Sequence, residues 1–165
     1  KYIFSNVNDW LKFAEAKHGG LILLNSAIII GVISVLPDSK LFDSYSAAAS
    51  LAICGCSILI SLASQFPTTS NLLIGASNKA NPNIYFFEDL SKTSLDGFLL
   101  EYRRSYPDFK PTASDENLVN QILVNSRIAT SKFRTFKICC YVSIFGIGLL
   151  GLSLLMRVLL VTTSL

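Results

Sequence analysis

Apolar and charged positions alternate along this chain in long blocks. Apart from His18, the stretches without formal charge are residues 18–37, 44–78 and 138–156. Uncharged apolar runs of about 18 or more residues are typical of transmembrane helices, because about 20 residues in a helix cross a hydrocarbon core of about 30 Å. The pattern therefore predicts an all-α integral membrane protein with about three transmembrane helices.

The predicted spans are residues 20–36, 45–66 and 138–160. Pro37 follows the first span and Pro67 follows the second, and proline marks a helix end. A cleavable secretory signal is the alternative for the first apolar run. However, an amphipathic segment with Asp9 and Glu15 precedes that run, and no small-x-small cleavage site stands before Pro37.

Two of the spans are expected to continue into helices outside the membrane. Residues 4–18 have helical periodicity, with an apolar stripe made of Val7, Trp10, Leu11, Ala14 and His18. Nothing between Lys17 and Leu21 forces a stop, so this helix is predicted to run through Gly19-Gly20, which we interpret as a hinge. A second long helix is expected from Asp115-Glu116 into the last span, about forty residues or about 60 Å.

Between these parts, residues 67–86 are typical of a loop, with an interfacial turn expected at 72–74. Residues 87–105 predict a helix that breaks near 91–94, where Thr93 or Ser94 caps a second helix. The predicted organisation is therefore an amphipathic helix, a two-span hairpin, a helical region and a last span with a short tail, at residues 1–19, 20–66, 67–137 and 138–165.

Composition and charge agree with this picture and give an orientation. Only 15% of the residues are charged and 51% are apolar, whereas soluble domains carry about 25% charged residues. Lysines 1, 12 and 17 precede the first span, Lys40 alone lies in the following loop, and residues 67–137 hold nine basic residues. Because basic residues resist translocation, the N-terminus and the middle region are predicted to be cytoplasmic.

The sequence offers little for catalysis. It contains one histidine and none of the HEXXH, GXSXG, P-loop or GXGXXG motifs, so we predict no enzyme, no metal site and no cofactor. His18 is interpreted as a packed imidazole. The four cysteines, at 54, 56, 139 and 140, all lie inside predicted spans and are expected to be small buried hydrophobic residues.

Asn25 stands in the middle of the first span. An unpaired amide is costly in hydrocarbon, so this side chain needs a partner, and such bonds contribute about 1 kcal/mol. Two interpretations stay open: a bond within one subunit, for example to Ser57 or Ser61, or a contact between subunits or a polar lining.

Basic residues with neighbouring aromatic rings are the candidates for ligand binding. A basic collar at the membrane explains Lys132, Arg134 and Lys137. It explains Arg127 less well, because Arg127 lies about two and a half turns from the membrane. Tyr85-Phe86-Phe87 and Tyr102-Arg103-Arg104 combine rings with guanidinium groups, although helix packing beside a solvated face is equally compatible with them. Nine basic against seven acidic residues in 67–137 argue against nucleic-acid binding.

Three local patterns carry a family resemblance: W-x-x-F-A-E-A-K from Trp10, N-P-x-x-x-F-F from Asn81, and Q-I-x-x-x-S-R-I-A-x-x-K-F-R from Gln121. With Asn25 in the first span, they resemble the transmembrane effectors of bacterial Pycsar antiphage defence, small membrane proteins that act beside a pyrimidine cyclase. The resemblance covers nearly the whole chain.

This resemblance implies that infection triggers synthesis of cCMP or cUMP and that the effector senses the nucleotide. It also implies that the protein lies in the bacterial inner membrane, whose integrity fails in abortive infection. A non-enzymatic membrane adaptor or scaffold for a cytoplasmic partner is the alternative function. The expected partners are the lipid bilayer, the cyclic nucleotide and further copies of the chain in a homo-oligomer. By chemistry alone, the phosphate candidates are Arg103, Arg104, Arg127, Lys132 and Arg134, and the stacking candidates are Tyr85, Phe86 and Phe87.

Overall fold

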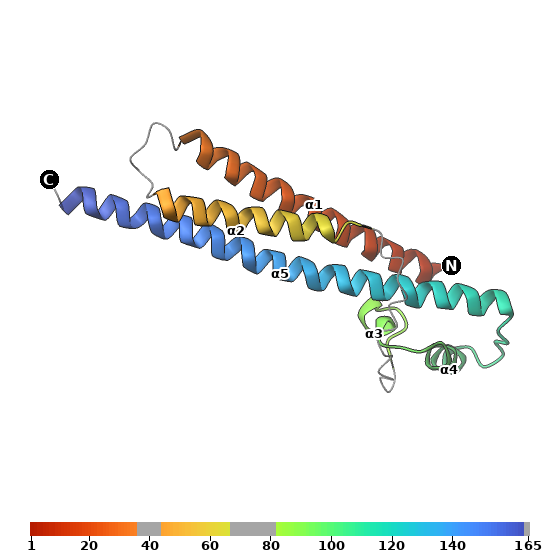
Figure 1. Ribbon diagram of the computed structural model, residues 1–165. Coiled ribbons are helices and arrows are strands. Elements are labelled where there is room, and N and C mark those ends of the chain that lie inside the picture. Colours follow the sequence, from red (N-terminus) through yellow and green to blue (C-terminus); the bar gives the residue numbers. More distant parts are fainter. Residues whose placement is uncertain (36–43, 67–81, 164–165) are drawn as a thin grey trace. The chain divides into compact units, whose positions relative to one another are not determined.

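The computed structural model describes residues 1–35, 44–66 and 82–163, and every regular element in these ranges is an α-helix (Figure 1). The helices are α1 (Tyr2–Val35), α2 (Ser44–Ala63), α3 (Phe87–Ser91), α4 (Leu95–Ser105) and α5 (Ala113–Thr163). Three of them, α1, α2 and α5, are long and apolar enough to cross a membrane. The predicted all-α class with three spans is therefore confirmed, whereas the turn expected at 72–74 lies outside the described residues.

Both predicted long helices are present without a break. Helix α1 has 34 residues and passes through Gly19-Gly20. Helix α5 has 51 residues, from Ala113 to Thr163, and is therefore longer than the expected forty. Its start is fixed by a reciprocal cap, in which Thr112 donates to the Asp115 carboxylate from its backbone N–H at 2.9 Å and its hydroxyl at 2.7 Å.

The expected helix break between residues 91 and 94 is also confirmed. Helix α3 ends at Ser91, and the backbone N–H of Gly97 donates to the Ser94 hydroxyl at 3.1 Å, so that Ser94 is the N-cap of α4. A serine here satisfies one of the donors that a new helix leaves unpaired. The cap therefore explains why the run from Phe87 to Ser105 forms two short helices.

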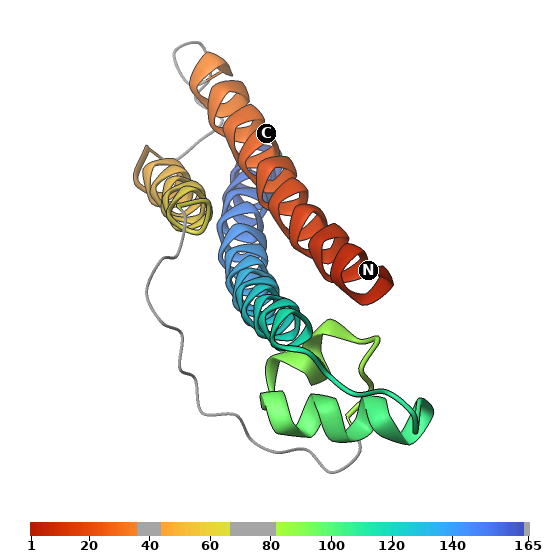
Figure 2. The ribbon, with the colours of Figure 1, turned by 90° about the vertical axis from the view of Figure 1, so that its right-hand side faces the viewer.

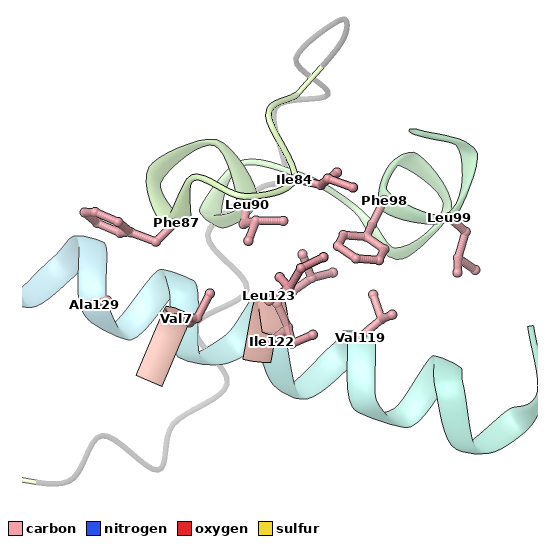
Figure 3. Packing of buried hydrophobic residues seen from close by; sticks show 11 residues of the cluster. Val7, Ile84, Phe87, Leu90, Phe98, Leu99, Val119, Ile122, Leu123 and Ala129 are labelled. Atoms are coloured by element: carbon pink, nitrogen blue, oxygen red, sulfur yellow. The ribbon is translucent and has the colours of Figure 1, made fainter. Parts of the chain in front are cut away.

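The chain forms two compact units, and α1 and α5 contribute to both. We call residues 1–16 with 67–134 the head unit, and residues 17–66 with 135–165 the membrane unit. Within the head unit, one apolar cluster joins α1, α3, α4 and α5. Figure 3 shows Leu90 of α3 and Phe98 of α4 pointing toward Val119, Ile122 and Leu123 of α5.

Polar contacts also hold the two long helices together within the head unit. Lys132 is only 7% exposed and pairs with Glu15 of α1 at 2.9 Å. The Asn125 amide donates to the Asn8 side chain at 2.8 Å. A buried lysine is tolerated only beside an opposite charge, so this pair fixes the register of α1 against α5.

In the membrane unit, α1, α2 and α5 lie side by side (Figures 1 and 2) and meet at Asn25. The Asn25 amide nitrogen lies 2.9 Å from the Ser143 hydroxyl, 3.5 Å from the Ser57 hydroxyl and 3.0 Å from the Leu21 carbonyl oxygen. Its partners are therefore within one chain. Ser57 was a predicted partner, Ser143 was not, and no bond joins Asn25 to Ser61.

The cysteine prediction is only partly right. Cys54 and Cys139 are buried and Cys140 is half-buried, but Cys56 is exposed, and all four thiols are free. Cys56 lies on the outer face of α2, beside exposed residues such as Leu59 and Ile60. Two residues of separation place Cys54 and Cys56 on different faces of one helix, because each helical residue turns by about 100°.

Candidate functional site

The head unit contains a cavity of about 490 Å³. This volume lies in the range of about 300 to 1,000 Å³ that is typical of small-molecule sites. Half of its twelve lining residues are aromatic, and the rings are those of Tyr2, Tyr85, Phe98, Tyr102, Tyr106 and Phe109. Lys1 and Asp115 add one positive and one negative charge to the lining. We call this the aromatic cavity.

Helix α4 and the turn after it supply four of these rings. Phe98 and Tyr102 are one helical turn apart, with nearly parallel rings and centroids 6.0 Å apart. Tyr106 caps the end of α4 and lies 4.8 Å from Tyr102. The backbone N–H of Phe109 donates to the Tyr106 carbonyl oxygen at 3.0 Å, and this turn brings the Phe109 ring to 4.9 Å from Tyr102.

Two distant segments complete the wall. Leu118, Val119 and Ile122 of α5 line the floor at spacings that place them on one helical face. Tyr2 of α1 faces Tyr85 with their ring centroids 6.2 Å apart. The contact is supported by Asn6, whose side-chain amide donates to the Tyr85 carbonyl oxygen at 2.9 Å.

The tyrosine hydroxyls add hydrogen-bonding groups to the largely apolar wall of the cavity. A side-chain hydrogen bond with Tyr106 raises the pKa of Tyr85 above its ordinary value, and nearby Tyr102 and Tyr2 act in the same direction. Tyr85 is therefore protonated at neutral pH and keeps a hydroxyl that can donate and accept. The cavity thus combines ring faces that stack planar ligands with a few hydrogen-bonding groups and a lysine for an anion.

Of the predicted stacking residues, the structure places one in the cavity. Tyr85 lines it and is 46% exposed. Phe86 is 39% exposed and does not line it. Phe87 does not line it but is buried in the apolar cluster of the head unit, where its ring centroid lies 5.2 Å from those of Trp10 and Phe133.

The predicted phosphate residues do not line the cavity. Arg103, Arg104 and Arg134 are exposed, and Arg104 pairs with Glu101 at 2.8 Å. Lys132 is the buried partner of Glu15 described above. The structure therefore does not bring these five basic residues together into one site.

Arg127 has a structural task in the head unit. Its guanidinium donates to the carbonyl oxygen of Ser91 at 3.3 Å and to that of Thr93 at 3.4 Å. These carbonyl groups follow the last turn of α3, where a helix leaves acceptors without partners. Arg127 thus docks the end of α3 onto α5.

The sequence contained a signal for the cavity that our sequence prediction did not use. Phe98, Tyr102 and Tyr106 recur every four residues, so they share one helical face, and Phe109 follows them closely. The sequence pattern instead favoured Arg103 and Arg104, because these basic residues directly follow an aromatic residue. Those two side chains lie on the opposite, exposed side of α4.

The predicted hinge glycines lie inside α1. A Cβ atom added at Gly19 or at Gly20 would meet no atom within 4 Å, so neither glycine is required for a close approach in the structure. His18, beside them, is 1% exposed, packs edge-on against Phe136 with ring centroids 5.6 Å apart, and lies 3.3 Å from the Ser64 hydroxyl. The interpretation of His18 as a packed imidazole is confirmed.

Together these observations define a helical membrane protein that carries a ligand-sized aromatic cavity in a helical head. Residues 1–159 match the Pycsar effector protein domain, PycTM, and the chain belongs to this family. The membership confirms the resemblance drawn from the sequence patterns, and it assigns the protein to the effectors of Pycsar antiphage defence. Comparisons with curated proteins and with solved structures gave no match.

Proposed function

We propose that the protein senses a cyclic pyrimidine mononucleotide, cCMP or cUMP, in the aromatic cavity and responds by impairing the integrity of the bacterial inner membrane. The role is non-enzymatic and leads to abortive infection. Family membership supports the defence role. The observation that carries the sensing role is the cavity, because its volume and its lining of six rings suit a planar base with an attached sugar phosphate.

In this proposal the rings and the charged groups have different tasks. Tyr102 and Tyr106 stack the pyrimidine, since stacking of a base on an aromatic side chain contributes about 1 to 3 kcal/mol. The Tyr85 hydroxyl bonds the base edge, and Lys1 pairs with the cyclic phosphate. The N-terminus and the head unit face the cytoplasm, where the nucleotide is made, and several copies of the chain assemble in the membrane.

Binding of cCMP and cUMP to the purified full chain in lipid nanodiscs tests the site. Tyr106→Leu removes a half-exposed ring and is expected to raise the Kd about five- to 150-fold, the equivalent of about 1 to 3 kcal/mol. Phe86→Leu is the matched control, because Phe86 is exposed in the same unit but lies outside the cavity. An unchanged Kd in Tyr106→Leu, or an equal loss in Phe86→Leu, contradicts the assignment of the cavity.

Leakage of K⁺ from liposomes that contain the full chain tests the response. Leakage is expected with cCMP or with cUMP and not with cAMP, whose larger purine fits the cavity less well. A protein that binds the nucleotide without leakage would favour the adaptor function instead.

A further inference from the structure

The buried interior of the membrane unit is rich in small and polar side chains beside Leu21 and Val32, whereas many large apolar side chains lie on its outer surface. The buried face of α2 consists of Ala47, Ser50, Cys54, Ser57 and Ser61, with no large aliphatic side chain. Exposed on the same helix are Leu59, Ile60 and Leu62. Small and polar residues turned inward are common where membrane helices pack closely, and hydrogen-bonding groups also line the pores of channels and transporters.

Hydrogen bonds connect this interior across all three helices. At its centre the Ser143 hydroxyl lies 2.9 Å from the Asn25 amide nitrogen and 2.8 Å from the Ser57 hydroxyl. Toward one end Ser46 and Ser153 lie 2.6 Å apart, and toward the other Ser64 bonds His18. From residue 46 to residue 64 the helical rise is about 27 Å, close to the thickness of the hydrocarbon core of about 30 Å.

Two fully buried oxygen atoms in this interior have no hydrogen-bond partner among the residues that the structure describes. They are Oδ1 of Asn25 and the hydroxyl oxygen of Ser61, and both residues are 0% exposed. A buried acceptor without a partner is rare, because it loses the hydrogen bonds that water would give it. Apolar side chains at these two positions would pack the helices without this loss. The two oxygens therefore indicate a binding partner, such as water or a cation, that has no room between the closely packed helices.

We propose that the polar interior of the membrane unit is the closed form of a path for water and small monovalent cations. The proposal rests on the proposed function and states how the membrane loses its integrity. When α2 moves away from α1 and α5, the hydroxyl and amide groups of the interior lose their hydrogen bonds to one another and form hydrogen bonds to water instead. Their oxygens, together with Asn25 Oδ1 and the Ser61 hydroxyl, coordinate cations in place of hydration water.

Two native cysteines provide matched probes of this path. Cys54 is 1% exposed and faces the interior, whereas Cys56, two residues further along α2, faces outward. We compare a full chain whose only cysteine is Cys54 with one whose only cysteine is Cys56, the other cysteines being alanine. Both are reconstituted in liposomes and treated with a water-soluble cationic methanethiosulfonate, which reacts with thiols only where water reaches them.

Addition of cCMP or cUMP is expected to accelerate labelling of Cys54 at least about tenfold and to leave labelling of Cys56 unchanged. An anionic methanethiosulfonate is expected to label Cys54 more slowly than the cationic reagent does. Leakage of K⁺ without accelerated labelling of Cys54 overturns the cation path and leaves the proposed function intact. The absence of both leakage and labelling, with nucleotide bound, overturns both proposals.

Ion selectivity gives a second measurement that needs no cysteine variant. Asn25→Asp places a carboxylate in the path at nearly constant volume and is expected to increase the permeability ratio of K⁺ to Cl⁻ in leaking liposomes. Ser34→Asp, on an exposed residue of the same helix, is the control and is expected to leave the ratio unchanged. Equal ratios in Asn25→Asp and in the unmodified chain contradict a path beside Asn25.

Discussion

Several residues for which the sequence alone favours ligand binding instead hold helices of this protein together. Arg127 stands out as a cation away from the membrane, and the sequence cannot reveal that two carbonyl groups at the end of α3 accept its hydrogen bonds. Lys132 similarly pairs with Glu15, which is distant in sequence. The need of Asn25 for a hydrogen-bond partner was predictable, because an amide in a membrane span is costly without one. Its bond to Ser143 was not predictable, because it depends on the register of α5 against α1.

Arg127→Ala is expected to destabilise the head unit by about 1 to 3 kcal/mol, the cost of leaving buried acceptors unpaired. The Kd for cCMP and cUMP is expected to stay within about twofold, because Arg127 does not line the aromatic cavity. Denaturant unfolding and nucleotide titration measure the two effects. Arg134→Ala, at an exposed position of α5, is the control for stability.

A loss of nucleotide affinity without a loss of stability would instead indicate that Arg127 binds the ligand. In that case the Kd in Arg127→Ala rises at least about tenfold while the unfolding free energy stays unchanged.

At the scale of elements, local chemistry in the sequence determines most of the fold. The apolar runs predict the three long helices, Ser94 predicts the start of α4, and the absence of proline predicts the continuity of α5. The aromatic cavity was not predicted, because its wall combines the start of α1 with Tyr85 and α4. Contacts between residues so far apart in sequence depend on tertiary packing, which helical periodicity does not specify.

Gly19 and Gly20 allow the hinge in α1 to be tested without a steric clash. Because added Cβ atoms meet nothing within 4 Å, the double change to alanine is expected to stiffen the helix, by about 0.8 to 1 kcal/mol per site. We expect nucleotide-induced leakage from liposomes to decrease at an unchanged Kd. Gly31→Ala in the same helix also meets nothing within 4 Å and controls for helix propensity alone. If the double variant leaks as much as this control, α1 has no hinge at these glycines.

At the scale of the whole molecule, two helices belong to both compact units. Helix α1 supplies Tyr2 to the aromatic cavity and Asn25 to the membrane interior, and α5 supplies Val119 and Ser143 in the same way. Both helices run without a break from the residues of one unit into those of the other. Helix α2 contributes to the membrane unit alone, so it is the element whose movement the proposed path requires.

Gly146 provides a way to move α2 without any ligand. A Cβ atom added there would lie 3.0 Å from Cγ2 of Ile53 and 3.2 Å from the sulfur of Cys54, so Gly146→Ala requires α2 or these side chains to shift by a few tenths of an ångström away from α5. Overpacking costs about 1 to 3 kcal/mol, which shifts a closed-to-open equilibrium about five- to 150-fold. We expect cation leakage from liposomes in the absence of cCMP and cUMP. Gly148→Ala, two residues along α5, meets nothing within 4 Å and is expected to stay closed. If both variants insert equally well and neither leaks without nucleotide, separation of α2 from α5 is not the opening step.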